Sequence, residues 1–419
     1  MFRAGGARFF RPLFRAMVPP DPRGRPARGD HRNGPDMSGF VLDRIPAITQ
    51  AEGALDQLGA LAARLGGGAP VLLVADPGLA RFGIIDRAEA SLRAARLTTL
   101  AFTGIQSDPL AAQVDAAAAL ARAGGAGVVV ALGGGSAMDA GKAAAAVAGA
   151  EAPAEHYALC ANPLPARVLP KICVPTTSGT GSETTRTAIV TNAAHAKVWL
   201  WGDEMKADAV LLDPTLTTGL PPHLTAATGI DALIHAIEAC TNANANAGND
   251  LFCHEAIRLV VRWLQAAVAE PGNLAARAAL QWAAALAGIA IDNAGTAIAH
   301  NIGHALASLR PLHHGRAVAV GMMATLAWNA AEDRDGRFAT VAALLGAPSA
   351  AALPAAYERL LRGVGVKVSL AGEGYDTITP AQLAAQMANE ENAAMRRSNR
   401  RPSTEADLLA FATTVLTQA

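Results

Sequence analysis

Histidines in the second half of the chain have the spacing of a metal site. Asp231 and His235 are four residues apart, His300 and His304 repeat that interval, and a His-His pair follows at 313–314. Residues four apart on a helix share one face, with Cβ atoms about 5–6 Å apart, so both can reach one ion. Histidine together with carboxylate suits divalent iron or zinc. One such histidine alone would be interpreted as a hydrogen-bonded core residue, but three groups in one Ala-rich region favour a metal site.

A run of glycines forms a second candidate site, for a phosphate group. Gly133-Gly134-Gly135-Ser136 follows a strand-like run and opens a helical one. Glycine lets the backbone approach a ligand closely, and a helix N-terminus supplies free N–H groups and a positive dipole end. The strict dinucleotide and P-loop motifs are both incomplete here. The alternative is a tight strand-to-helix turn that binds nothing.

Two further segments are polar enough to contact a nucleotide. Residues 175–187 are dense in Thr, Ser and Gly, which suits phosphate or ribose contacts, although a plain polar loop explains them equally well. Asp76 follows an early strand-like run, where a carboxylate can meet a ribose hydroxyl. Its neighbours Pro77 and Gly78 also make it an ordinary turn former, and its position alone favours that interpretation.

The elements that must position these residues alternate in the first half of the chain. Buried, strand-like runs alternate with helical patterns, which predicts a parallel sheet with helices on both faces. The predicted strands are 71–74, 98–102, 127–132 and 168–174, and the predicted helices are 85–95, 109–123 and 137–148.

The second half changes character near Pro221. Ala-rich helical segments continue to the C-terminus and strand signals nearly vanish. The sequence therefore predicts a Rossmann-like parallel α/β domain over 37–220, followed by an all-α domain over 221–419.

Composition excludes several classes of protein. Lys+Arg and Asp+Glu are both 35 and aromatic residues are 4%, which argues against a basic or base-stacking nucleic-acid binder. Four cysteines in 419 residues form no disulfide framework, which is typical of a cytoplasmic protein. No apolar run reaches the ~18–20 residues of a membrane span; the Ala-rich stretches 143–150 and 283–291 are interpreted as tightly packed helices.

Residues 1–36 differ from the rest of the chain. They contain eight Arg, no Lys and no Glu, and prolines interrupt them. An Arg-rich, acid-poor start suits an organelle transit peptide. We favour instead a disordered or spurious extension ahead of a start at Met37.

The motifs taken together resemble the iron-dependent (group III) alcohol dehydrogenases, from about Ser38 to the C-terminus. The similar segments are 133–142 (GGGSAMDAGK), 175–183 (PTTSGTGSE), 229–238 (GIDALIHAIE), the histidines of 300–315 and 399–402 (NRRP). The first four of these motifs, in this order, are highly specific. The resemblance implies a dehydroquinate synthase-like fold whose active site lies between the α/β and helical domains.

The resemblance also implies roles for individual residues. The implied metal ligands are Asp231, His235, His300 and His314, holding Fe²⁺ or alternatively Zn²⁺. His304 corresponds to a histidine near the reacting centre and is a candidate proton relay. The implied cofactor is NAD, with contacts at Gly134, Gly135, Ser136, Asp139, Thr176, Thr177, Thr185 and Lys197 and with Asp76 selecting NAD over NADP.

The expected activity is reversible hydride transfer between NAD(H) and a small alcohol, aldehyde or ketone. The protein is expected to be a cytoplasmic homodimer or higher homo-oligomer, without nucleic-acid or membrane partners.

The chain departs from the family pattern at two positions. His313 stands where the family often has Pro, and Ala307 where Gly is common, which affects the substrate more than the chemistry. Relatives of maleylacetate reductase, glycerol dehydrogenase and dehydroquinate synthase are the competing enzymes. A non-catalytic NAD- or metal-binding protein is the alternative outside enzymes.

Overall fold

The computed structural model describes residues 39–417, so the expected extension 1–36 lies outside the described residues. Contacts between residues assign Met37–Ala419 to a single compact unit. Within it, the described strands all precede Asp213, and the described chain from Pro222 onward is helical apart from its connections. The predicted change of character near Pro221 therefore matches the order of elements.

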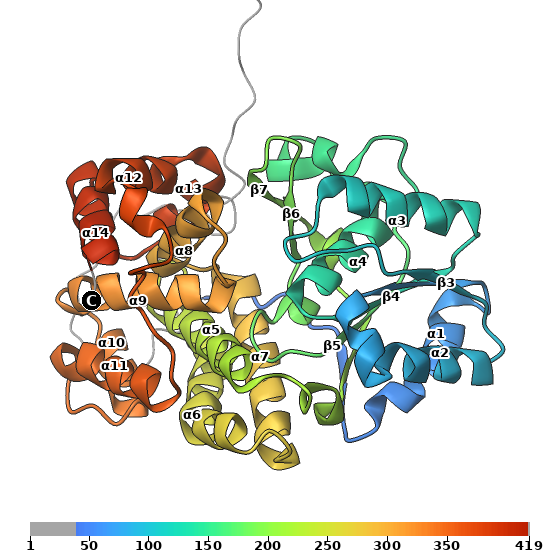
Figure 1. Cartoon of the computed structure of the whole chain (residues 1–419), viewed down its shortest axis with the longest axis horizontal. Coiled ribbons are helices and arrows are strands. Elements are labelled where there is room, and N and C mark those ends of the chain that lie inside the picture. Colours follow the sequence, from blue (N-terminus) through green and yellow to red (C-terminus); the bar gives the residue numbers. More distant parts are fainter. Residues whose placement is uncertain (1–38, 418–419) are drawn as a thin grey trace, which may run out of the picture. The chain divides into compact units, whose positions relative to one another are not determined.

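Six strands form a parallel sheet in the order β1-β8-β5-β4-β2-β3 (Figure 1). Every neighbouring pair runs in parallel, which confirms the predicted sheet type. The short strands β1 and β8 were not expected from the sequence. The bounds are β1 Ala47–Gln50, β2 Val71–Ala75, β3 Thr99–Phe102, β4 Val128–Gly133, β5 Lys171–Pro175 and β8 Ala209–Leu212.

Alternate residues of the central strands face two helical layers. Leu72 and Val129 pack toward α3 and α4, whereas Leu73 and Val130 pack toward α1 and α2. Strands buried on both faces read as continuous hydrophobic runs, which explains why they could be recognised in the sequence. The bounds are α1 Leu58–Gly66, α2 Ile84–Ala94, α3 Ala111–Ala123 and α4 Gly135–Val147.

An antiparallel hairpin follows the sheet strand β5. It consists of β6 (Thr187–Thr191) and β7 (Lys197–Trp201), and it forms a separate two-stranded sheet. The sequence did not predict it. Its first strand follows the Thr/Ser/Gly segment directly, and Lys197 is the first residue of β7.

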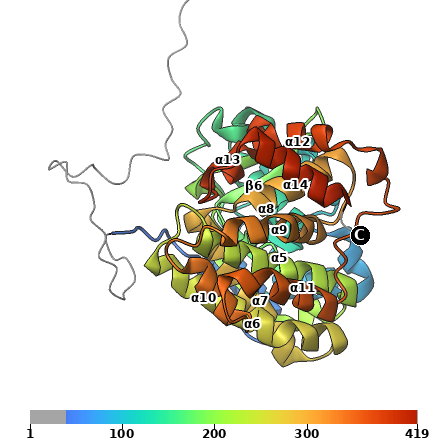
Figure 2. The same ribbon diagram turned by 90° about the vertical axis from the view of Figure 1, so that its left-hand side faces the viewer.

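Ten α-helices make up most of the described second half of the chain (Figures 1 and 2). Their bounds are α5 Pro222–Thr241, α6 Ala247–Ala269, α7 Leu274–Ala294, α8 Ile298–Leu309, α9 His314–Ala330, α10 Arg337–Leu344, α11 Leu353–Gly363, α12 Pro380–Ala388, α13 Glu390–Ser398 and α14 Glu405–Thr417.

Helix α7 differs from expectation in one respect. Among the described helices it alone is long and apolar enough to cross a membrane by length and composition, although no such span was expected. It packs against α5 and α6, and 67% of its most apolar stretch is buried within the protein. A core helix built largely from Ala meets the same criteria as a membrane span, so the packing supports the interpretation as a tightly packed helix.

The loop after β5 touches helix α7 backbone to backbone. Gly181 has a φ of +62°, and a Cβ there would lie 2.5 Å from Gly288 Cα. A Cβ on Gly288 would in turn lie 2.3 Å from the Gly181 carbonyl oxygen. Nearby, Gln281 of α7 donates to the Pro175 carbonyl at 3.1 Å. These contacts fix the Thr/Ser/Gly loop between the sheet and the helices.

Candidate active site

Four side chains from three helices converge on one point. Asp231 and His235 lie on α5, His300 lies on α8 and His314 is the first residue of α9. Their ligand atoms all lie within 4.8 Å of one another. The Asp231 Oδ1 atom is at the centre, 3.9, 3.7 and 3.6 Å from the Nε2 atoms of His235, His300 and His314 respectively.

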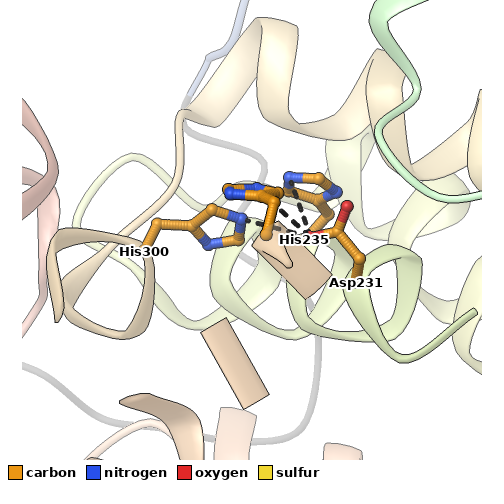
Figure 3. Close-up of side chains that lie close together, drawn as sticks. Asp231, His235 and His300 are labelled. Atoms are coloured by element: carbon orange, nitrogen blue, oxygen red, sulfur yellow. Dashed lines mark ion pairs between the residues drawn. The ribbon is translucent and has the colours of Figure 1, made fainter. Parts of the chain in front are cut away.

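The cluster contains buried polar atoms that make no hydrogen bond. Asp231 Oδ1 and His300 Nε2 are both inaccessible to solvent, and neither has a hydrogen-bond partner anywhere in residues 39–417. Burying a polar atom without a partner costs about 1–3 kcal/mol. Figure 3 shows the rings of His235 and His300 directed at the Asp231 carboxylate. This arrangement fits a bound cation that completes the bonding of these atoms.

The sequence makes this convergence sterically possible at Gly315. A Cβ at that position would lie 2.2 Å from the Ala227 carbonyl oxygen and 3.3 Å from Asp231 Cβ. Any side chain there would push the start of α9 away from α5. The His-Gly pair therefore brings His314 to the carboxylate, and the 30% exposure of the His314 side chain marks the open side of the cluster.

The charge states of three of the four side chains suit metal binding. Burial opposes ionisation of Asp231, but His235, His314 and His300 together hold its pKa below the usual range. Burial lowers the pKa of His235 to about 4 and that of His314 to about 3, against the attraction of Asp231. Both rings therefore keep a free lone pair at neutral pH. Burial also opposes protonation of His300, yet Glu238 and Asp231 raise its pKa to about 9. A metal ion must therefore displace a proton from this ring when it binds.

His304 lies beside the cluster and is not one of the four converging residues. Its ring centroid is 5.4 Å from that of His314 and 6.5 Å from that of His300. Burial, His314 and Lys197 hold the pKa of His304 well below its usual value. The His304 imidazole is therefore neutral at neutral pH and has one ring nitrogen with a free lone pair.

The hairpin supplies a cation near these histidines. Lys197 Nζ forms an ion pair with Asp108 Oδ1 at 2.7 Å. The Asp108 backbone N–H donates to Ser136 Oγ at 3.2 Å, so Asp108 connects Lys197 to the glycine loop.

His313 is the N-cap residue of α9, and burial lowers its pKa despite the opposing charges of Asp231 and Asp108.

Six of the predicted nucleotide residues lie where β2, β4 and β5 end: Asp76, Gly134, Gly135, Ser136, Thr176 and Thr177. Gly133 ends β4 and Gly135 begins α4, which is the strand-to-helix turn expected for a phosphate cradle. A Cβ on Gly134 would lie 3.4 Å from Thr177 Cγ2, and one on Gly135 would lie 2.8 Å from Thr180 Cγ2. The Thr176 backbone N–H donates to the Gly133 carbonyl at 2.8 Å. The glycine loop and the Thr/Ser/Gly loop are therefore adjacent.

Asp76 lies at the same edge and acts as a turn former. Its Oδ1 accepts a hydrogen bond from the Gly78 N–H at 2.8 Å and caps the short helix Pro77–Phe82. A Cβ on Gly133 would lie 3.1 Å from Asp76 Cβ. The carboxylate is thus next to the glycine loop, and the turn and nucleotide interpretations of Asp76 are compatible.

Asp139 and Thr185 are engaged inside the protein. Asp139 accepts hydrogen bonds from Ser182 Oγ and, at 3.0 Å, from the Ile189 N–H, and burial raises its pKa. Thr185 Oγ1 accepts from Lys142 Nζ at 3.2 Å. The hydrogen bonds of Asp139 and Thr185 therefore stabilise the conformation of residues 182–189.

Lys142 is the centre of that support, and the sequence motif containing it gave no hint of its role. Its side chain is completely buried. Its Nζ donates to the Ser182 carbonyl at 2.7 Å and to the Thr187 carbonyl at 2.5 Å. A buried ammonium is stable only when its donors are satisfied, and these carbonyls satisfy them. Lys142 therefore fastens the loop and the hairpin to α4.

Family models match both halves of the chain. Residues 46–214 match the model described as "Iron-containing alcohol dehydrogenase", and residues 225–415 match "Fe-containing alcohol dehydrogenase family, C-terminal".

The chain belongs to the iron-containing alcohol dehydrogenase family.

Similar proteins with described activities support this assignment. A long-chain-alcohol dehydrogenase of Geobacillus thermodenitrificans is 38% identical over 64% of this chain and 68% of its own length. A 1,3-propanediol dehydrogenase of Klebsiella pneumoniae is 36% identical over 67% of this chain and 73% of its own length.

Solved structures of the family share the fold. A 1,3-propanediol oxidoreductase has a TM-score of 0.82 at 32% identity, covering 90% of this chain and 100% of its own. A sulfoacetaldehyde reductase from Bifidobacterium kashiwanohense, solved with NAD⁺, has a TM-score of 0.83 at 27% identity, covering 91% and 99%. The expected dehydroquinate synthase-like fold and family membership are confirmed. The protein is a metal-dependent, NAD-linked oxidoreductase of alcohols and aldehydes.

One buried acid of this dehydrogenase titrates near neutrality. Glu183, 2% exposed in the Thr/Ser/Gly loop, has its pKa raised by burial from 4.5 to about 7, although Lys142 opposes the shift. Between pH 4.5 and about pH 7, Glu183 is therefore protonated in the folded protein but ionised in the unfolded chain. The free energy of unfolding of the protein should fall as pH rises through this range, by up to about 3 kcal/mol.

A Glu183→Gln variant should show a flatter pH profile between pH 5 and pH 8. Urea unfolding midpoints at several pH values measure it, with Glu52→Gln, an exposed acid, as the matched control. An unchanged slope in Glu183→Gln would mean that this carboxyl titrates normally.

Proposed function

We propose that Asp231, His235, His300 and His314 hold one divalent metal ion, with iron as the resident ion and zinc as the alternative. The convergence of their four ligand atoms within 4.8 Å supports this assignment most directly. Carboxylate and imidazole are ligands that suit both metals, and the two partnerless buried atoms would gain a bonding partner.

We propose that the chain oxidises a small alcohol, or reduces the matching aldehyde or ketone, beside this cluster. The metal supplies Lewis acidity toward the substrate oxygen when it is bound. The nicotinamide of NAD carries the hydride. His304 is placed to take up the proton of the alcohol oxygen, because its ring is neutral and adjacent to His314 without belonging to the cluster.

The cofactor contacts are proposed at the loops described above. The Gly134, Gly135 and Ser136 turn offers backbone donors at the start of α4, and Thr176 and Thr177 border it. We assign Asp139 and Thr185 to the support of this surface, since both are engaged with neighbouring residues. Lys197 remains a proposed cofactor contact, since it pairs with Asp108 and its charge also lowers the pKa of His304.

Two measurements test the proposed function together. Elemental analysis of protein purified without chelator should show near-stoichiometric iron or zinc. A panel of alcohols, followed by nicotinamide absorbance, should then show metal-dependent reduction of NAD⁺. Full activity of chelator-treated, metal-free protein would contradict the assignment.

Replacing Asp76 should weaken the preference for NAD over NADP. A carboxylate near the 2′-phosphate of NADP repels it by about 4 kcal/mol at 4 Å and an effective dielectric of 20, less where solvent penetrates. Asp76→Gly should therefore raise kcat/KM for NADP relative to NAD at least ~10-fold.

Asp76→Asn separates the charge from the turn, because its amide oxygen can still cap Gly78. Asp86→Asn, an exposed acid on α2, serves as the control. Equal kcat/KM for both cofactors in the unmodified enzyme would rule out this role for Asp76.

We further propose three parts for the chain: an extension over 1–36, a nucleotide-binding domain over 37–220 and a metal-binding domain over 221–419. Family matching begins at residue 46 and resumes at residue 225, which supports this division. A protein that starts at Met37 should keep its melting temperature and kcat. A marked loss of either would show that the extension packs on the fold.

A cytoplasmic homodimer is the proposed state. The free thiols of all four cysteines are compatible with a reducing compartment. Phe40, Val41, Leu42 and Ile45 are 38–56% exposed just before the edge strand β1, where a second copy would bury them. Sedimentation velocity measures the oligomeric state directly.

A further inference from the structure

Glu238 is a buried carboxylate without an assigned role. It lies on α5, two helical turns after Asp231, and is 3% exposed. Its two oxygens accept three short hydrogen bonds. Oε1 accepts from the Ala299 N–H at 2.7 Å, and Oε2 accepts from the Ala297 N–H at 2.7 Å and from His300 Nδ1 at 2.6 Å.

The bond to His300 determines which ring nitrogen can bind a metal. An ionised carboxylate can only accept, so Nδ1 must carry the proton of this hydrogen bond. Once the ring is neutral, its lone pair is then on Nε2. That atom points into the cluster, 3.7 Å from Asp231 Oδ1, and has no hydrogen-bond partner within the described chain. Glu238 thus selects the tautomer that the cluster needs.

The two backbone bonds fix the helix that carries His300. Helix α8 begins at Ile298, and its N-cap residue Ala297 has no side chain that can cap it. The first N–H groups of a helix lack partners within the helix, and a negative charge there is favourable. Glu238 supplies the missing cap from α5. One carboxylate therefore sets both the position of α8 and the orientation of its histidine.

The charge of Glu238 also requires an explanation. Among the ion pairs of residues 39–417, its only recorded partner is His300. A buried carboxylate is stable only when it is paired and hydrogen-bonded, and the His300 ring and two backbone N–H groups do this for Glu238.

We propose that Glu238 is a positioning residue that orients His300 for metal binding and holds α8 against α5. The proposal rests on the proposed function in one respect, namely that the four converging residues bind a metal. Glu238 itself stays outside the coordination sphere.

Glu238→Gln tests the role with nearly the same shape. An amide has one accepting oxygen and one donating nitrogen, so it cannot accept on both sides. If its oxygen faces His300, the amide nitrogen meets the Ala299 N–H. In the flipped orientation, the amide donates to Nδ1 and favours the proton on Nε2, which blocks metal binding.

The expected result is a 10–100-fold weaker affinity for Zn²⁺ or Co²⁺ alone, measured by chelator competition. The absorption spectrum of bound Co²⁺ should also change, which a purely structural role would not cause. Thr241→Val is the matched control, because it removes a buried hydrogen bond within the same helix, to the Ile237 carbonyl. The control should bind both metals as the unmodified protein does.

An unchanged metal affinity together with an unchanged Co²⁺ spectrum in a folded Glu238→Gln variant would overturn the proposal. Failure of the unmodified protein to bind metal would instead contradict the proposed function. If the variant does not fold, a crystal structure of the Zn²⁺-loaded unmodified protein decides. A Glu238–His300 Nδ1 hydrogen bond with zinc on Nε2 supports the role, whereas zinc bound by Glu238 or by Nδ1 overturns it.

Discussion

A His235→Ala protein is expected to lose its metal and, with it, about 10³-fold or more of its kcat. Removing this imidazole leaves three of the four converging side chains, with Asp231 Oδ1 still buried and without a compensating partner. Lewis-acid stabilisation is worth several kcal/mol, and each 1.36 kcal/mol corresponds to a factor of ten in rate. Elemental analysis and steady-state kinetics on the same preparation measure both losses.

His156→Ala is the control for this experiment, since His156 is exposed and far from the cluster in the sequence. It should keep metal and activity. Full metal content in His235→Ala would show that this histidine is not a ligand, and the assignment of the site would then fail.

His304→Ala should instead keep the metal while kcat falls by about 10²–10⁴-fold, the usual contribution of general acid–base catalysis. The ring is close to His314 and His300, yet it is not among the four side chains whose ligand atoms converge. It can therefore accept a proton without holding the ion. Metal content, the affinity for NAD and kcat should be measured together.

Ser308→Ala is the matched control on α8, because it removes only a hydrogen bond to the His304 carbonyl. It should leave kcat nearly unchanged. If metal content falls in parallel with activity in His304→Ala, His304 is a ligand or a structural support, and the proton relay must be assigned elsewhere.

These two histidines show where sequence reasoning was sufficient and where it was not. The four-residue interval correctly placed Asp231 beside His235 on one helix. The same interval between His300 and His304 does not say which ring enters the cluster. That depends on α9, which brings His314 to one side of α8, and on Glu238, which orients His300. Both are long-range contacts.

The secondary structure was likewise predictable only in part. Central strands such as β2 and β4 are continuous apolar runs, so their pattern revealed them. The hairpin of β6 and β7 and the edge strand β1 are short and only partly buried, and their pattern is weak. Lys142 was equally hidden, because its function is to satisfy carbonyls that come together only in the folded chain.

The contact between Gly181 and Gly288 limits how this enzyme can evolve. Each residue occupies the space that a methyl group on the other would need, so an alanine at either position is blocked by backbone and a pair of alanines cannot compensate. Neither glycine can therefore be replaced singly while the loop packs against α7. Libraries that aim to reshape the cofactor surface should therefore leave both glycines fixed.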